Sequence, residues 1–482
     1  MHKDSIKKNY LYNLAFQVVN LILPLITTPY ISKTLGPENV GIYSYTYAYI
    51  SSFILIGSLG IATYAQREIA TSIGQEDRTQ KFWEIFLVKL LTITATTILF
   101  FMFALIYGTY RFYFLIQLPY FLAAILDISW FFQGIEIFKR VSIRNILIKT
   151  IGLVLIFGLV KNKNHLYIYI LILCASQVVG NLTMWINIKK YIGRMKTKKL
   201  CLSRHIKPAL IYFVPTVAYQ IYAVLDKAML GILGQDILQN GYYEQAHKLI
   251  NMVIMVIGSY NAVMRSRMSA LFAERKKAAI EYYMIRSLHF VSFLIYPMMF
   301  GLAGIASNIV PWFFGEEYGP VIYLLVLFSP MFVVQGLRTC IGSHLITPRG
   351  STVQAKVNYG SIISALSNVI LNYLLIPRFA ASGAVIASIA SELIMLITCL
   401  MLTKEYVNVA EIAFVGWKYA LAAVVMLIPV RILSEGLRPS LIHSVIIVVI
   451  GVCVYLAVLC VLRENMVLSY LRELMNKCAK KR

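Results

Sequence analysis

The sequence predicts an all-α polytopic membrane protein with about 14 transmembrane helices. Hydrophobic residues make up 59% of the 482 residues and charged residues only 14%. Soluble globular domains contain about 45–50% hydrophobic residues and about 25% charged residues. The apolar residues gather in stretches of about 20, the length that an α-helix needs to cross the hydrocarbon core of a bilayer. This composition excludes an ordinary soluble enzyme, a disordered protein and a disulfide-rich scaffold.

The apolar stretches give the positions of the predicted spans. In chain order they cover residues 11–33, 41–63, 83–107, 112–133, 143–160, 166–188, 209–233, 246–270, 285–308, 318–340, 357–376, 382–403, 412–432 and 441–462. The first of them follows a basic start but no small-residue cleavage site, so we expect it to be retained as a span and not removed as a signal peptide.

The distribution of basic residues predicts the orientation. With both termini in the cytoplasm, 34 of the 45 Lys and Arg residues fall on the cytoplasmic side, seven fall outside and four lie within spans. Cytoplasmic loops of membrane proteins carry an excess of Lys and Arg. We therefore expect a multi-pass membrane protein with both termini in the cytoplasm, in contact with membrane lipids. Because the charge is spread over short loops, nucleic acid is not an expected partner.

A basic segment at 189–207 divides the chain. It is either a charged linker that touches anionic headgroups or a docking site. We expect a six-helix bundle before it (1–188), a second one after it (208–403), and two extra helices with a basic tail at the end (404–482).

The two bundles resemble each other in sequence. Leu-Gly followed by Gly-x-Tyr occurs at 35–43 and again at 233–243, an offset of about 200 residues. Repeats six spans apart have the same orientation, which predicts a pseudo-twofold axis along the membrane normal. Prolines interrupt the opening helix of both halves, as in transporters whose site lies between two repeats.

Polar side chains form stripes on the opening helices. Gln17 and Asn20 lie on one face of the first span, and Tyr219 and Tyr222 lie on one face of the seventh. Such residues either hydrogen-bond neighbouring helices or line a wet cavity. Their presence in both halves favours the cavity, and we expect these four residues to contact a substrate.

Ionisable residues within the spans are the second group of candidates. Asp127, Asp226 and Glu392 are candidate ion-coupling groups, because a charge at bilayer depth is costly and usually functional. Lys227 and Lys248 are candidate cationic contacts to a substrate. Lys248, with Lys89 and Lys149, also lies close enough to a span end to extend to the membrane interface.

Several kinds of chemistry have no motif in this sequence. It contains no GxxxxGK[ST] phosphate-binding loop, no HExxH pair and no zinc-like cysteine spacing. We therefore predict a protein that is not an enzyme and that has no cofactor and no metal site.

Two stretches carry a family resemblance. The run QVVNLILPLITTPYISKTLGPENVGIYSY (17–45), continued by LGIATYAQREIA (59–70), resembles the opening of the polysaccharide transporter family. These are Wzx-type flippases for O-antigen, capsule and exopolysaccharide repeat units, in the multidrug/oligosaccharidyl-lipid/polysaccharide (MOP) exporter superfamily. The segments 219–235 and 241–249 resemble the seventh-span region of the same family.

The resemblance implies a flippase for undecaprenyl-diphosphate-linked oligosaccharide repeat units. It would move them from the inner to the outer leaflet of the bacterial cytoplasmic membrane by alternating access, for surface polysaccharide biosynthesis. A polymerase and glycosyltransferases of the same pathway are the implied partners. Arg67 and Arg267, at the inner ends of corresponding helices, are candidate ligands for the diphosphate through paired N–H donors. The alternative is that both arginines only anchor their helices in the cytoplasm.

Other functions stay open at this point. A multidrug or cation antiporter, or a lipid II flippase, of the same superfamily would have the same fold. A membrane-embedded polysaccharide polymerase or ligase would need a sizeable external loop, and the predicted external loops are short.

Overall fold

The structure is a computed structural model that describes residues 3–186, 188–193, 200–234 and 236–469. Within these residues the chain forms α-helices, brief 3₁₀ and π segments and no strand, which confirms the all-α prediction. The chain divides into two compact units, Met1–Gly241 and Tyr242–Arg482. This boundary lies after the basic segment 189–207. The division into two six-helix bundles and two extra helices remains a prediction.

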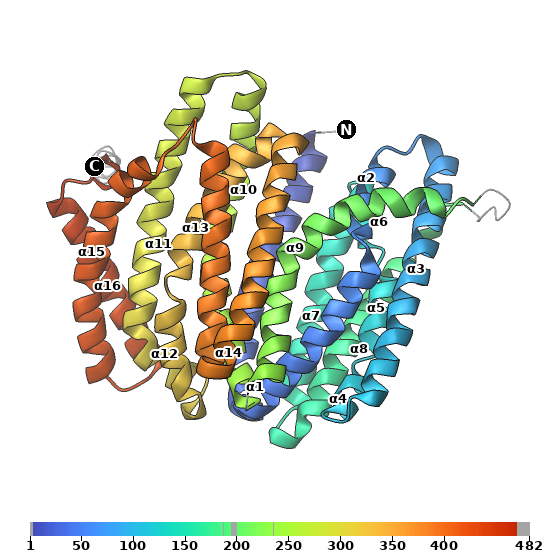
Figure 1. The fold of residues 1–482 in the computed structure, drawn as a ribbon, viewed down its shortest axis with the longest axis horizontal. Helices are drawn as coiled ribbons and strands as arrows, with labels where there is room; N and C mark the ends of the chain where they lie inside the picture. Colours follow the sequence, from blue (N-terminus) through green and yellow to red (C-terminus); the bar gives the residue numbers. More distant parts are fainter. Residues whose placement is uncertain (1–2, 187, 194–199, 235, 470–482) are drawn as a thin grey trace. The chain divides into compact units, whose positions relative to one another are not determined.

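The first unit is built almost entirely of helices. Its elements are α1 (Lys3–Ser58), α2 (Ile61–Ala70), α3 (Gly74–Ile106), α4 (Arg111–Ile116), α5 (Pro119–Leu126), α6 (Ser129–Gly134), α7 (Phe138–Leu159), η1 (Lys163–His165), α8 (Leu166–Trp185), η2 (Ile188–Lys190) and α9 (Ser203–Leu233). Within this unit α2, α6 and the start of α9 lie at one end, and α4 lies at the opposite end (Figure 1).

Helix α1 contains two of the predicted spans. It is broken at Gly36, whose φ of 76° and ψ of 171° are not helical and suit a residue without a Cβ. The predicted spans 11–33 and 41–63 lie on either side of this break. Just beyond it, a Cβ on Gly41 would come 2.3 Å from the carbonyl oxygen of Ile237 and 3.0 Å from the backbone nitrogen of Gly241. The glycines that the sequence repeat pairs therefore pack closely together.

The predicted span 112–133 is not one helix but three, and its breaks determine where Asp127 lies. Pro119 begins α5, a position where its missing N–H costs no hydrogen bond. Asp127 follows α5 in an extended conformation (φ −69°, ψ 107°). Its Oδ1 accepts a hydrogen bond of 2.9 Å from the backbone N–H of Ser129, at the start of α6. A hydrogen-bonded carboxylate thus stands at a helix break in the last third of this predicted span.

Apolar side chains cover both the inside and the outside of this unit. Phe114 is fully buried near α4, and Phe82 and Trp130 are buried near α2. On the outside, Leu99 and Val154 are 58% and 63% exposed. An apolar surface of this kind is unfavourable in water and is suited to contact with lipid.

The second unit begins within the next long helix. Its elements are α10 (Leu238–Ala273), α11 (Lys277–Phe313), η4 (Glu316–Tyr318), α12 (Gly319–Phe328), α13 (Met331–Ile341), η5 (Gly342–Ile346), η6 (Thr347–Arg349), α14 (Ser351–Thr403), α15 (Val409–Gly436) and α16 (Leu441–Val461).

The last two helices pack against α11 through specific hydrogen bonds. The Nδ2 of Asn308 donates to the carbonyl oxygen of Leu437 at 3.1 Å, and the indole Nε1 of Trp312 donates to the Oγ of Ser444 at 2.7 Å. These contacts fix the turn between α15 and α16 to the end of α11. The helices predicted as additions to the second bundle are therefore part of the second unit.

The number of spans is lower than predicted when length and composition are the criteria. Among the described residues, nine helices meet them, or ten if Glu316–Phe328 and Met331–Arg349, bent by 48°, form one span. Two of the nine, Ile22–Ala70 and Val353–Thr403, each contain a break, at Gly36 and at Ala380. Val353–Thr403 therefore includes two predicted spans, 357–376 and 382–403, and Ile22–Ala70 includes 41–63 and part of 11–33. The protein is a multi-pass membrane protein, and the count of 14 is not confirmed.

Candidate functional site

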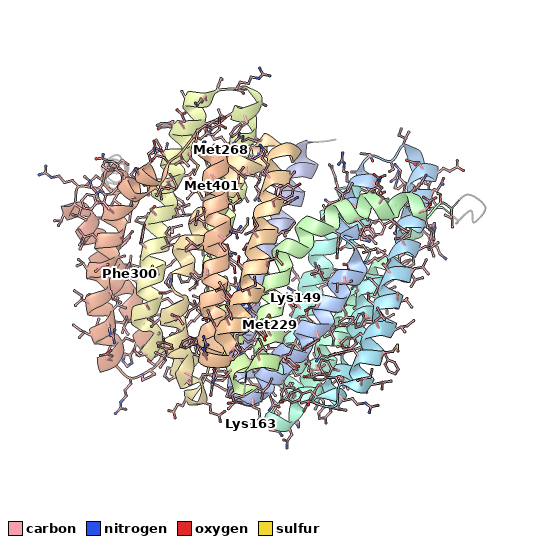
Figure 2. All side chains as sticks on the ribbon, in the orientation of Figure 1. Lys149, Lys163, Met229, Met268, Phe300 and Met401 are labelled. Atoms are coloured by element: carbon pink, nitrogen blue, oxygen red, sulfur yellow. The ribbon has the colours of Figure 1, made fainter. Side chains whose placement is uncertain are left out.

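A cavity of about 450 Å³ lies inside the first unit, between α1, α7 and α8. Arg144 and Lys149 line it from α7, and Asp127 lines it from the break after α5. Its size falls within the range of about 300–1,000 Å³ that is usual for small-molecule sites. In Figure 2, Lys149 lies partway along the unit and Lys163 lies at its end, and both side chains are exposed.

Arg144 is held in place by amide side chains. Its Nε donates to Oδ1 of Asn145 at 3.1 Å, and its Nη1 donates to Oδ1 of Asn181, on α8, at 3.0 Å. Asn181 in turn donates through Nδ2 to the carbonyl oxygen of Ala123 at 2.7 Å. These bonds connect α7, α8 and α5, and they orient a guanidinium whose charge is not neutralised by either amide.

A second cavity of about 390 Å³ adjoins the first. The two share three lining residues: Asp127, Gln177 and Asn181. The second cavity is otherwise lined by α1, α2 and α5 and by Lys89 of α3. Gln177 and Asn181 are one helical turn apart on α8, so that one face of this helix separates the two spaces.

Lys89 is buried, with 6% of its surface exposed. Its Nζ donates a hydrogen bond of 2.6 Å to the backbone carbonyl oxygen of Asp127. The prediction that Lys89 extends to the membrane interface is therefore wrong. The side chain points inward because it satisfies the carbonyl that the break after α5 leaves without a helical partner.

Positive charges outnumber negative charges on the combined lining of the two cavities. Among the described residues, the lining carries three cations, Lys89, Arg144 and Lys149, and one carboxylate, Asp127. An excess of positive charge attracts anions, and the attraction is stronger where a cation such as Lys89 is buried than it is in water. The site is therefore suited to an anionic group.

The predicted polar stripes lie partly outside the described residues. The side chains of Gln17, Asn20, Tyr219 and Tyr222 fall there, so their predicted contact with a substrate remains untested. Of the predicted coupling groups, Asp127 lines both cavities and Asp226 is buried on α9 with 1% of its surface exposed.

Lys227 and Lys248 are both half-buried, Lys227 on α9 and Lys248 on α10. Neither of them is without an interaction partner, and the same is true of Asp226. The proposed roles of these three residues stay predictions.

Glu392 lies in the second unit, where it forms a buried ion pair with Arg338. Arg338 donates to the carboxylate through Nε and through Nη2, the latter at 3.5 Å. The two side chains are 12% and 3% exposed. The pair joins α13 to α14, and Arg338 was not among the predicted site residues.

The two arginines predicted to bind phosphate are both exposed. Arg67 lies in the last turn of α2, in the first unit. Arg267 lies on α10, in the second unit, and its guanidinium carbon stands 4.1 Å from the centre of the Tyr283 ring. Arg267 also donates a hydrogen bond to the Tyr283 hydroxyl. That Arg67 and Arg267 bind a diphosphate together stays a prediction.

Sequence reasoning missed Arg144, although the sequence held an indication of its role. The predicted span 166–188 contains Ser176, Gln177, Gly180 and Asn181, small and polar residues at helical spacing. A stripe of this kind predicts a polar face, and Arg144 stands at the start of the preceding span. That the two helices face each other could not be inferred from either one alone.

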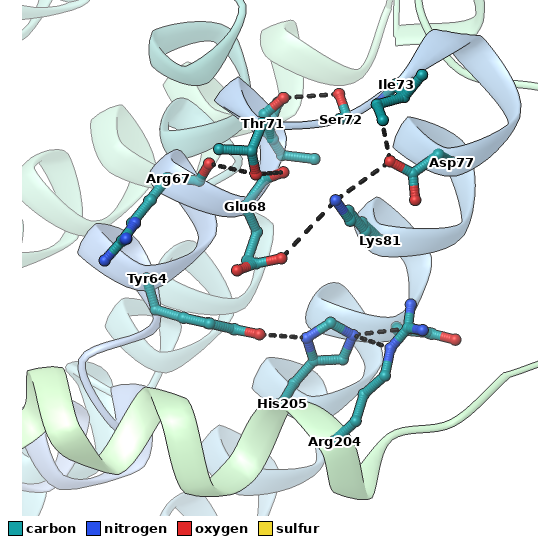
Figure 3. Close-up of polar contacts among 12 residues, drawn as sticks. Tyr64, Arg67, Glu68, Thr71, Ser72, Ile73, Asp77, Lys81, Arg204 and His205 are labelled. Atoms are coloured by element: carbon teal, nitrogen blue, oxygen red, sulfur yellow. Dashed lines mark hydrogen bonds and ion pairs between the residues drawn. The ribbon is translucent and has the colours of Figure 1, made fainter.

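A second polar cluster lies at the end of the first unit that contains α2 (Figure 3). We call it the Glu84 cluster; it consists of Tyr64, Glu84, Arg204 and His205. Glu84 is completely buried, and its Oε2 lies 2.5 Å from Nη2 of Arg204 and 2.7 Å from Nε2 of His205. The other imidazole nitrogen, Nδ1, lies 2.6 Å from the Tyr64 hydroxyl.

The partners of His205 determine its tautomer. A carboxylate only accepts hydrogen bonds, so Nε2 carries the hydrogen and Nδ1 accepts from the Tyr64 hydroxyl. Burial lowers the pKa of His205, although Glu84 acts in the opposite direction. The cluster joins α2 and α3 to the first turn of α9. Its groups satisfy one another, which indicates a structural role.

The fold defines a polytopic α-helical membrane protein, and its first unit holds two adjoining cavities. The chain belongs to the family described as polysaccharide biosynthesis protein, which matches residues 6–272. The family resemblance seen in the sequence is thereby confirmed.

Individual relatives agree with this family. The chain is 26% identical over 410 residues to a protein of Escherichia coli (strain K12) named "Putative O-antigen transporter", covering 83% of this chain and 97% of the relative. It is 23% identical over 206 residues to the "Probable low-salt glycan biosynthesis flippase Agl15" of Haloferax volcanii, covering 42% of this chain and 43% of the relative. These relatives are named as transporters and flippases and not as enzymes.

Solved structures show the same fold. The inward-facing structure of a multidrug resistance MATE family transporter of the MOP superfamily superimposes with a TM-score of 0.63 at 16% sequence identity. The match covers 85% of this chain and 96% of that one. At this identity the similarity establishes the fold.

Proposed function

We propose that the protein is a flippase that moves undecaprenyl-diphosphate-linked oligosaccharide repeat units from the inner to the outer leaflet of the bacterial cytoplasmic membrane by alternating access. The observation that carries this proposal is the cationic lining of the cavities in the first unit. The family and the names of the relatives agree with a polysaccharide substrate.

The charges of the site fit a diphosphate. Two phosphodiester groups carry about two negative charges, and the lining offers Lys89, Arg144 and Lys149 against one carboxylate. A guanidinium presents paired N–H donors in a planar fork that matches phosphate oxygens. Arg144 is the principal candidate for this contact, with Lys149 five residues further along α7. A multidrug or cation antiporter is disfavoured, because this lining would repel a cationic drug.

The membrane potential supplies a driving force. Outward movement of negative charge across an inside-negative membrane is favourable by about 2.3 kcal/mol per charge per 100 mV. A proton or cation moving inward through Asp127, Asp226 or Glu392 would add to it. Of these three carboxylates, Asp127 stands on the lining of both cavities. Both termini lie in the cytoplasm in this proposal, on the side where the lipid-linked unit is made.

The proposed partners follow from the transport step. Glycosyltransferases that build the repeat unit on the inner leaflet supply the substrate, and a polymerase on the outer side consumes it.

Transport by the purified full-length chain in liposomes tests the proposal. The probe is an undecaprenyl-diphosphate-linked oligosaccharide, and flipping is measured by the accessibility of its sugars to an impermeant reagent. We expect Arg144→Gln/Lys149→Gln to slow flipping by roughly tenfold to a hundredfold, since a hydrogen bond to a charged group contributes about 1.5–3 kcal/mol. Lys163→Gln is the matched control, because Lys163 is an exposed lysine outside both linings. Equal rates for the double variant and the control would contradict the proposal.

A further inference from the structure

We propose that the second cavity of the first unit binds the sugar attached directly to the diphosphate. The inference rests on the proposed function, and it divides the ligand between two adjoining spaces. The diphosphate occupies the cavity lined by Arg144 and Lys149. The first sugar occupies the cavity lined by Tyr47, Ser51 and Ser58.

One face of α1 supplies most of the sugar side. Tyr47, Ser51 and Ser58 are four and seven residues apart, so they project from the same face of the helix, and all three line the second cavity. Thr63, just beyond in α2, adds another hydroxyl to the same lining. Tyr47, Ser51 and Ser58 are half-buried and Thr63 is exposed, so these hydroxyls are accessible to a ligand in the cavity.

The two serines are prepared to accept hydrogen bonds. The Oγ of Ser51 donates to the carbonyl oxygen of Ala48 at 3.0 Å, and the Oγ of Ser58 donates to that of Ile54 at 2.7 Å. Each hydroxyl proton is thus committed to the serine's own helix, and the oxygen lone pairs remain as acceptors. Sugar hydroxyls can donate hydrogen bonds to these serine oxygens.

Aromatic side chains complete the lining. Tyr47 and Tyr120 both line the cavity, and their rings pack edge to face with centroids 5.2 Å apart. The hydroxyl of Tyr120 also lies 3.4 Å from that of Tyr43, which fixes the ring further. A pyranose ring has apolar C–H faces and polar edges. It therefore suits a space in which tyrosine rings and hydroxyls are mixed.

The adjacency of the two cavities matches the covalent structure of the ligand. The first sugar is bonded to a phosphate oxygen, so the two subsites must adjoin. Asp127, Gln177 and Asn181 belong to both linings, and Asn181 accepts the 3.0 Å hydrogen bond from Arg144. The side chain that orients the phosphate ligand therefore also borders the sugar subsite.

The size of the second cavity limits what it recognises. A volume of about 390 Å³ lies near the lower end of the range for small-molecule sites. It does not enclose a whole repeat unit together with its lipid. The proposal therefore places selectivity in the first sugar and leaves the later sugars outside this subsite.

Binding measurements with two lipids test the inference on the purified full-length chain. One probe is undecaprenyl diphosphate carrying an oligosaccharide, and the other is undecaprenyl diphosphate without sugar. We expect Ser51→Ala/Ser58→Ala to weaken binding of the first probe by about tenfold, the effect of one to two hydrogen bonds, and to leave binding of the second unchanged. The matched control is Ser52→Ala, because Ser52 also bonds to the carbonyl oxygen of Ala48, at 2.8 Å, but does not line the cavity.

A filling substitution separates the subsites further. Ser51→Leu should exclude the sugar-bearing probe and still bind the bare diphosphate lipid, and thermal unfolding identifies a variant that fails to fold. Equal weakening of both probes by either Ser51 variant would mean that the second cavity holds phosphate beside Lys89, and would overturn the inference. Unchanged binding of both probes by all serine variants would overturn it as well. A different variant tests the proposed function: binding of both probes by Arg144→Gln/Lys149→Gln as tight as by the parent chain would contradict it.

Discussion

The Nε2 atom of His205 lies 2.7 Å from Oε2 of Glu84, and this contact ties the first turn of α9 to α3. The acceptor oxygen belongs to a carboxylate with no exposed surface, which also accepts from the backbone N–H of Cys201 at 2.9 Å. A buried carboxylate is stable only when its partners replace the water it has lost. The Glu84 cluster therefore holds the start of α9 against the first unit.

Glu84→Gln is expected to destabilise the protein. The substitution removes the ion pair with Arg204 and one acceptor in a buried site. Because Arg204 is 44% exposed and is resolvated in the variant, the loss should be about 2 kcal/mol, below the 3–5 kcal/mol typical of a fully buried pair. In detergent solution this corresponds to a fall in Tm of roughly 4–8 °C. Glu435→Gln removes an exposed i,i+4 pair with Arg431 and is the control, with little change expected.

The Glu84 cluster also illustrates what the sequence could predict. Apolar stretches located the helices, because about 20 apolar residues in a row have one stable conformation in a bilayer. His205 and Glu84 are separated by 121 residues. No periodicity within either helix indicates such a contact, because it depends on how the helices pack.

At the candidate site, too, the sequence predicts a residue's place in a span but not its contacts with other helices. Asp127 was predicted as an ionisable residue inside a span, and it does line both cavities. Its position at a helix break, and the approach of Arg144 from α7, depend on the turn at Pro119 and on the packing of α7 against α8. The sequence predicted that the bundle contains polar residues, and the structure shows which of them meet.

Stability should depend on pH through His205, which precedes the predicted span 209–233. Burial lowers its pKa below the ordinary value of about 6.5. The folded protein therefore binds this proton less readily than the unfolded chain. The stabilisation is fully present above about pH 6.5 and is lost as the pH falls from there toward the lowered folded-state pKa.

His205→Gln tests this pH dependence, since it retains hydrogen bonding but does not titrate. We expect the difference in Tm between pH 7.5 and pH 5.5 to be smaller in the variant than in the parent chain. His165→Gln provides a control, because His165 is more accessible, in η1. An unchanged difference in the His205 variant would show that other groups control the acid sensitivity.

Because Glu392 pairs with Arg338, a transport defect in Glu392→Gln has two possible explanations, lost stability and lost ion coupling. Glu392→Gln leaves Arg338 without its counter-charge, at a cost of about 3–5 kcal/mol, and it also removes a candidate coupling group. The double variant Arg338→Gln/Glu392→Gln removes both charges, so it should recover most of the lost Tm. Flipping in liposomes then distinguishes the two roles. Transport restored together with stability means that Glu392 is structural, and transport still impaired in a stable double variant assigns it to coupling.

Arg67 and Arg267 remain candidate phosphate ligands. Each is exposed, and each also has a structural explanation. Arg67 lies in the last turn of α2, where a cation interacts favourably with the helix dipole. Arg267 stacks on the ring of Tyr283. Lysine separates the two roles, because it retains the charge and the anchoring but loses the planar fork that binds two phosphate oxygens.

If the arginines bind phosphate, Arg67→Lys and Arg267→Lys should each slow flipping of the lipid-linked oligosaccharide by about tenfold, the loss of one charged hydrogen bond. Abundance and membrane insertion should not change. Arg265→Lys is the control, since Arg265 is an exposed neighbour on the same helix and its Nη2 lies 3.4 Å from the Oγ of Ser343. Full transport by the double lysine variant would show that Arg67 and Arg267 only anchor their helices. Capture of the diphosphate would then rest on Arg144 and Lys149, inside the first unit.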